Sequence, residues 1–88
     1  MGFLFQSGDE YVMLVINRQE KYIKLGSSKT NYQFEKLPWR YLFDKGEEEE
    51  QDKITEKLND HEFEATIIAA FASKGYSLVK KVGAGDVS

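Results

Sequence analysis

The side chains that most often carry out catalysis are sparse in this chain. It contains one histidine, His61, and no cysteine, so it offers no thiolate nucleophile and no pair of soft ligands for a transition metal. His61 is the only side chain that titrates near neutral pH unaided, but its position beside Glu62 and Glu64 is typical of an exposed first helical turn. The sequence therefore predicts a protein that is not an enzyme and has no catalytic residues.

Two further patterns resemble parts of metal or cofactor sites but lack what the chemistry requires. The acidic run Glu47–Glu50 with Asp52 has neither the alternating oxygen ligands nor the turn glycine of a calcium loop. The segment Gly83-Ala84-Gly85 begins like a phosphate-binding loop, but the helix that a dinucleotide site needs does not follow it. We therefore expect no metal and no cofactor.

A stretch of interleaved rings and basic side chains is the best candidate for a binding site. The residues in it that we predict to bind are Lys21, Tyr22, Lys24, Lys29, Tyr32, Lys36, Trp39, Arg40 and Tyr41. A sheet that displays rings with lysines beside them is a common way to hold single-stranded nucleic acid. The alternative is that the alternating rings form the core while the lysines face water.

Charge is distributed unevenly along the chain. The stretch 17–45 has seven basic and three acidic side chains, a net charge of +4, whereas 46–64 has nine acidic and two basic side chains, a net charge of −7. Such asymmetry is typical of a protein with charged partners. The other interpretation is that the two halves belong to one surface and attract each other.

One helix is predicted over residues 60–74, because both of its ends are specified by local sequence. Asn59 is a good N-cap, and Glu62 three residues later completes a capping box. Gly75 is suited to the left-handed conformation that ends a helix. The apolar side chains at three- and four-residue spacing, which face the core, are Phe63, Ile67 and Phe71.

Strands are predicted on both sides of this helix. The segments with strand-like composition or alternation are 11–16, 21–25, 32–35, 39–43 and 76–82. The run 11–16 is apolar on both faces, so it is expected at the sheet centre or under a second subunit. Pro38 cannot sit in a central ladder, which puts the start of 39–43 at an edge. Residues 1–9 and 83–88 are expected to be loose ends, and 44–53 an acidic flexible loop. This loop leads into a short element that the sequence leaves open, because Ile54 and Leu58 could share one side of a helix or one face of a strand.

These elements predict a single α+β domain over residues 1–88. We expect an antiparallel sheet of three to five strands with one main C-terminal helix packed on one face, in the order β-β-β-(β)-α-β. The opposite face of the sheet is not very polar, which suggests a homodimer that buries this face or pairs sheet edges. The apolar runs are too short for a membrane span, and the absence of cysteine fits a reducing compartment, so a cytoplasmic protein is expected.

The stretch 72–79, Ala-Ser-Lys-Gly-Tyr-Ser-Leu-Val, resembles the ending of a family of small bacterial β-α-β domains of unknown function. In that family a helix leads into a Gly-Trp-Glu-Leu-Val strand, so Gly75, Leu78 and Val79 match, while Tyr76 and Ser77 differ. Trp39-Arg40-Tyr41 resembles the family's opening aromatic strand, and the resemblance covers 39–82. It implies a small β-α-β unit and supplies no catalytic residues.

The function predicted from the sequence is therefore that of a small non-catalytic accessory module of bacterial or phage type. It would bind a partner protein, including a second copy of itself, through a sheet face or edge. The residues expected to make that contact are the exposed members of Tyr22, Tyr32, Trp39, Arg40 and Tyr41. The alternative is single-stranded nucleic-acid or nucleotide binding on the same surface, with Lys21, Lys24, Lys29 and Lys36 on the phosphates.

Overall fold

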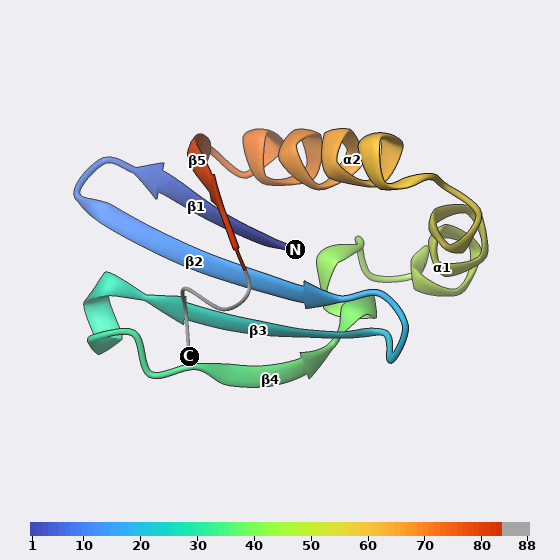
Figure 1. Ribbon diagram of the computed structural model, residues 1–88, viewed down its shortest axis with the longest axis horizontal. Coiled ribbons are helices and arrows are strands. Elements are labelled where there is room, and N and C mark those ends of the chain that lie inside the picture. Colours follow the sequence, from blue (N-terminus) through green and yellow to red (C-terminus); the bar gives the residue numbers. More distant parts are fainter. Residues whose placement is uncertain (84–88) are drawn as a thin grey trace.

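Five antiparallel strands form one sheet in the order β4-β3-β2-β1-β5 (Figure 1). The computed structural model describes residues 1–83. Its strands are β1 Gly2–Ser7, β2 Glu10–Asn17, β3 Tyr22–Ser27, β4 Glu35–Pro38 and β5 Ser77–Val82. Its helices are α1 Glu48–Glu56 and α2 Asp60–Ser73, with the 3₁₀ turns η1 Ser28–Thr30 and η2 Trp39–Leu42. The predicted α+β class and antiparallel sheet are confirmed, and α1 is a second helix that the sequence did not predict.

The N-terminal segment is a strand inside the sheet, so the prediction of a loose end at 1–9 is wrong. β1 pairs with β2 on one side and with β5 on the other. Phe3 and Phe5 are fully buried. Gly8 has a φ of +58° and joins β1 to β2 through a two-residue turn with Asp9, which is a favoured hairpin connection. Of the other predicted loose end, 83–88, only Gly83 lies within the described residues.

The segment around Pro38 also differs from the prediction. The strand that was expected over 32–35 is β4, Glu35–Pro38, and the strand expected over 39–43 is instead the 3₁₀ turn η2. Pro38 is extended, with a φ of −61°, and the chain then turns so that Trp39 and Leu42 both enter the core. The alternation of apolar residues in this segment is also typical of a strand. Trp39 and Leu42, the two buried residues, are three positions apart, which is the spacing of one turn of a 3₁₀ helix.

Residues 48–56 form helix α1, so the prediction of a flexible loop at 44–53 is wrong for most of its length. Three glutamates occupy the first turn of α1, where negative charge is favourable next to the positive end of the helix dipole. Asp52 and Thr55, three residues apart, are buried against the rest of the domain. The helix is therefore held by a narrow polar face that a search for apolar stripes does not detect.

Helix α2 has the ends that the sequence predicted. Asn59 Oδ1 accepts a hydrogen bond from the Glu62 backbone N–H at 2.8 Å, and Glu62 Oε1 accepts one from the Asn59 N–H at 3.1 Å. Gly75 has a φ of +89°, and the Tyr76 N–H donates to the Phe71 carbonyl at 3.0 Å. This is the bond of a Schellman C-cap. The capping box and the C-terminal glycine are thus confirmed.

The core lies between one face of the sheet and the two helices. Its strand members are Phe3, Phe5, Val12, Leu14, Ile16 and Ile23, and its helical members are Trp39, Leu42, Phe63, Ile67 and Phe71. The Phe5 and Phe71 rings stack with centroids 4.2 Å apart. In Figure 1, α2 lies beside β5 and β1 at the top of the view, and β4 lies at the bottom. No helix within residues 1–83 is long and apolar enough to cross a membrane.

Candidate functional site

The sheet face turned away from the helices is the first candidate surface. Alternate residues of a strand point to opposite faces, and the strand residues of the core point to the helices. The larger side chains that point the other way are Leu4, Tyr11, Met13, Val15, Tyr22, Lys24, Phe34, Lys36, Lys80 and Val82. We call this set the open face, because no helix of residues 1–83 packs on it.

The centre of the open face is aliphatic. Leu4, Met13, Val15 and Val82 are half-buried there by their neighbours alone. Gly2 lies among them, and a Cβ at this position would come 2.7 Å from Cγ2 of Val82. Because Gly2 has no side chain, there is room beside it for the side chain of Val82 on the edge strand β5. The result is an apolar patch on a surface that the other elements within residues 1–83 leave uncovered.

The charges of the open face all have the same sign. Its charged side chains are Lys24, Lys36 and Lys80, and no carboxylate points to this face from the strands of residues 1–83. Lys24 and Lys36 are directly opposite each other on β3 and β4. Like charges in such a pair destabilise a sheet, so an anion bound between them would relieve the repulsion.

Three rings border the aliphatic centre. Tyr11 is partly exposed, and Phe34 lies over Gly26, where a Cβ would come 3.2 Å from the ring. The Lys36 Nζ sits 4.1 Å from the centroid of the Tyr22 ring, in cation–π contact. One face of Tyr22 is thus occupied by a lysine from the same sheet.

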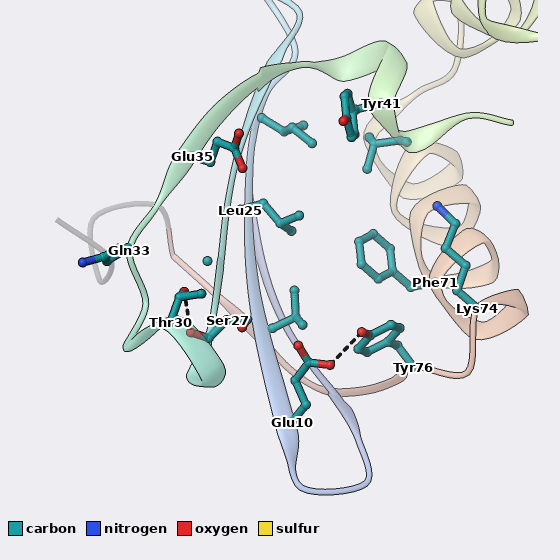
Figure 2. Close-up of a pocket in the computed structure, with 14 residues that line it drawn as sticks. Glu10, Leu25, Ser27, Thr30, Gln33, Glu35, Tyr41, Phe71, Lys74 and Tyr76 are labelled. Carbon is teal, nitrogen blue, oxygen red and sulfur yellow. Dashed lines mark hydrogen bonds between the residues drawn. The ribbon is translucent and has the colours of Figure 1, made fainter. Parts of the chain in front are cut away.

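A cleft on the opposite, helix-facing side of the sheet is the second candidate surface. It lies between β2–β4 and the C-terminal end of α2 and has a volume of about 370 Å³. Its apolar lining consists of Val12, Ile23, Leu25, Leu42 and Phe71. Figure 2 shows Leu25 and Glu35 on the sheet wall, Phe71 and Lys74 on the helix wall, and Gln33 directed away from the cavity. The volume falls in the lower part of the range for small-molecule sites.

Glu10 and Tyr76 close one end of the cleft. The Tyr76 hydroxyl donates a hydrogen bond of 2.9 Å to Glu10 Oε1 (Figure 2), and Lys29 Nζ lies 4.0 Å from the same oxygen. The hydrogen bond to Glu10 raises the pKa of Tyr76 above its usual value, and burial and the nearby negative charge raise it further. Tyr76 therefore stays a neutral hydrogen-bond donor throughout the neutral pH range.

A third group of polar residues surrounds Asp52 and serves the fold. Trp39 Nε1 donates to Asp52 Oδ1 at 2.8 Å inside the core. Lys21 Nζ lies 3.5 Å from the same carboxylate, and Arg40 Nε lies 3.4 Å from its other oxygen. These contacts connect α1 to η2 and to the β2–β3 turn. Lys21 and Arg40 are thus paired with a carboxylate of the same domain.

The nine residues predicted to bind are distributed over separate parts of the molecule. Tyr22, Lys24 and Lys36 come together on the open face. Lys21, Trp39 and Arg40 surround Asp52, and Trp39 is only 2% exposed, so it is not available to a partner. Tyr41 lines the cleft and is 67% exposed, Lys29 lies near Glu10, and Tyr32 is exposed after η1.

Sequence reasoning missed the rest of both surfaces. The aliphatic residues of the open face were detectable in part, because the run 11–16 is apolar at every position and so places Met13 and Val15 opposite the core. Lys80 and Val82 reach the open face through the pairing of β5 with β1, which the sequence does not reveal. The cleft depends on the distance between α2 and β4, and no local pattern encodes it.

No group of three or more histidine, cysteine, aspartate or glutamate side chains in residues 1–83 is arranged to hold a metal ion. Comparisons with models of protein families, with curated proteins and with solved structures found no significant match for this chain. The resemblance over 39–82 therefore stays a prediction.

Proposed function

We propose that the protein is a non-catalytic interaction module that binds an acidic, partly apolar surface of a partner protein on its open face. The observation that carries this proposal is the composition of that face, which combines an aliphatic centre with three lysines and no carboxylate. The chain as a whole has a net charge of −3, so this face departs in sign from the rest of the molecule. An apolar centre with a charged rim is the usual anatomy of a protein interface.

The repulsion between Lys24 and Lys36 supports an anionic partner. These lysines make no ion pair within residues 1–83, and only Lys36 has a favourable contact, with the Tyr22 ring. A carboxylate placed between the two ammonium groups would convert an unfavourable pair into two favourable ones. The partner is therefore expected to carry carboxylates beside an apolar side chain.

The geometry favours the face of the sheet over its edges. β4 has four residues and ends in Pro38, which offers no N–H to an added strand. β5 has a register irregularity opposite Leu4 and Phe5 and carries Lys80 and Lys81. Short strands, proline, bulges and lysines are the devices by which proteins block pairing at sheet edges.

One surface with the required chemistry belongs to the protein itself. Glu50 and Ile54 lie four residues apart on α1, and the N-cap residue Glu47 precedes Glu50 by three, so the three share one side of the helix. Ile54 is 50% exposed, and the two glutamates make no ion pair within residues 1–83. A second copy can therefore place α1 on the open face, with Ile54 on the aliphatic centre. Such a contact joins different surfaces of the two copies and is head-to-tail.

Two charge-reversal variants test this proposal by sedimentation velocity at low and moderate salt. The first, K24E/K36E, alters the open face, and the second, E47K/E50K, alters α1. The wild type is expected to increase in average mass with concentration at low salt, and each variant alone is expected to stay monomeric. An equimolar mixture of the two variants should associate again, because one intact copy of each surface remains and the two reversed surfaces also carry opposite charges.

The matched control is K45E/K74E, which changes the net charge equally but alters exposed lysines outside the open face. It should associate like the wild type. If the control lost self-association as fully as K24E/K36E, the association would depend on net charge alone, and the proposal would be wrong. Association of the wild type that both reversals leave intact would place the contact on another surface.

Nucleic-acid binding on the same face is a second candidate, favoured by its three lysines and by the exposed rings of Tyr11 and Phe34. The aliphatic centre and the lysine on the Tyr22 ring count against it, because bases stack on open rings. Because Trp39 is buried, its fluorescence is a poor reporter of this face. Anisotropy of labelled single-stranded DNA and RNA is the better test. Saturable binding that weakens steeply with salt and is lost in K24E/K36E would favour this candidate.

A further inference from the structure

We propose that the cleft between α2 and β3–β4 binds an amphipathic organic cation, an ammonium group on an alkyl or aryl body. This site lies on the helix-facing side of the sheet, so it is separate from the open face and does not depend on the interaction proposed there. The cleft exists because α2 lies beside β5 and β1, whereas β3 is approached on its helix side by the short turn η2. Part of the apolar inner surface of β3 is consequently left without a helix over it.

The apolar body of the ligand would occupy the space that a helix would otherwise fill. Leu25 on β3 and Phe71 on α2 face each other across this space in Figure 2. Leu42 of η2 also lines the cleft. Leu25 stays half-exposed although its neighbour Ile23 on the same strand face is buried. A ligand that covers Leu25 removes apolar surface from water, which is the main source of affinity in a site of this kind.

The charges that line the cleft favour a cation. Two carboxylates, Glu10 and Glu35, lie on the sheet side, and the Glu35 carboxylate makes no hydrogen bond or ion pair within residues 1–83. The C-terminal end of the 14-residue helix α2 adds partial negative charge at Lys74 and Gly75. Lys74 is the one ammonium group among the lining residues. Glu10 is already paired, because Lys29 Nζ lies 4.0 Å from its carboxylate, so Glu35 is the carboxylate that a ligand cation would meet.

The rings of the cleft are also suited to a cation. Tyr41, Phe71 and Tyr76 all line it, and the faces of such rings attract ammonium groups. The Nζ of Lys74 already lies 5.8 Å from the centroid of the Phe71 ring, in a cation–π contact. Glu35 on the opposite wall is free to pair with an ammonium from the ligand, while the Phe71 ring packs on its apolar body.

The test compares three probes of equal chain length, n-octylammonium, n-octanol and octanoate, each titrated into the full-length protein and followed by amide chemical shifts. Octylammonium is expected to give saturable shifts at cleft residues such as Gly26, Ser27 and Tyr76, and to bind more tightly than the other two. In E35Q its affinity should fall about two- to fivefold, the size expected for one partly exposed ion pair. The matched control is E49Q, an exposed glutamate of α1 outside the cleft.

Each other result would overturn the proposal. Equal or tighter binding of octanoate would show that Lys74 determines the charge preference, and equal binding of octanol would show that charge has no part. Equal affinities of E35Q and E49Q for octylammonium would show that Glu35 does not contact the ligand. An absence of saturable shifts at the cleft residues would show that the cleft does not bind it. The amide spectrum of each variant also reports whether it is folded, so a loss of binding is not confused with unfolding.

Discussion

Asp52 is the residue on which the docking of helix α1 depends. Its carboxylate accepts the Trp39 indole N–H at 2.8 Å in a buried location and lies near Lys21 and Arg40, at 3.5 and 3.4 Å. Replacing Asp52 with alanine would leave the indole N–H buried without an acceptor, because Trp39 is only 2% exposed. The same change would remove both ion pairs.

The expected loss follows from these contacts. A hydrogen bond to a charged acceptor contributes about 1.5–3 kcal/mol, and the loss of the acceptor leaves a buried donor unsatisfied. The two ion pairs involve side chains of Lys21 and Arg40 that are 39% and 58% exposed, so each adds only a few tenths of a kcal/mol. D52A should therefore lower the free energy of unfolding by about 2–4 kcal/mol, which corresponds to a decrease in Tm of roughly 10–25 °C for a domain of this size.

Urea unfolding followed by circular dichroism measures this loss, with D52N as the matched control. Asparagine keeps an acceptor oxygen for the indole N–H and removes only the charge, so its cost should be about 1 kcal/mol. In a W39F background, where the donor is absent, the D52A change should cost about 1 kcal/mol or less. Equal stabilities of D52A and D52N, or an undiminished cost of D52A in W39F, would refute the role given to this hydrogen bond.

Three other substitutions give predictions of different kinds. K24E removes the like-charge pair on the open face and should raise the free energy of unfolding by about 0.2–1 kcal/mol in urea, while it abolishes binding on that face; a less stable variant would contradict this. The Glu10 hydrogen bond raises the pKa of Tyr76, so the folded state holds this proton more tightly than the unfolded state and stability should fall as pH rises above about 10. Y76F should show a smaller decrease over the same alkaline range in urea titrations, and identical pH profiles would contradict the assignment. G2A should lose about 1–3 kcal/mol in thermal unfolding, because a Cβ there meets Cγ2 of Val82 at 2.7 Å and its carbonyl oxygen at 2.8 Å; a wild-type Tm would show that β5 shifts without cost.

The parts of the fold that the sequence predicted are those specified by neighbouring residues. The N-terminus of α2 depends on hydrogen bonds between Asn59 and Glu62, and its C-terminus on Gly75. These interactions are complete within a few residues, so no knowledge of the rest of the chain is needed to recognise them. The run 11–16 was recognisable for a similar reason, because its uninterrupted apolar composition suits a strand at the centre of a sheet.

The elements that were predicted wrongly depend on distant partners. The turn η2 and helix α1 stabilise each other through the Trp39–Asp52 hydrogen bond, and neither segment has a local pattern that identifies the contact. The strand β1 is buried because β5, which lies more than 70 residues later in the chain, pairs with it. The alternation at 39–43 therefore predicted a strand, and the acidic run at 44–53 was predicted to be a loop although the spacing of Glu49 and Lys53 also suits a helix.

The sequence alone determined that the protein has rings and lysines in one basic stretch and an unusually apolar central strand. Only the tertiary structure decided which of these side chains meet. The register of β3 with β4 puts Lys24 beside Lys36, and the pairing of β5 with β1 adds Lys80 from the other side. The buried indole of Trp39 and the cleft beside Leu25 likewise follow from where the helices lie. The physical reason is that strand order and register are set by contacts across the whole domain, whereas composition and helix caps are local.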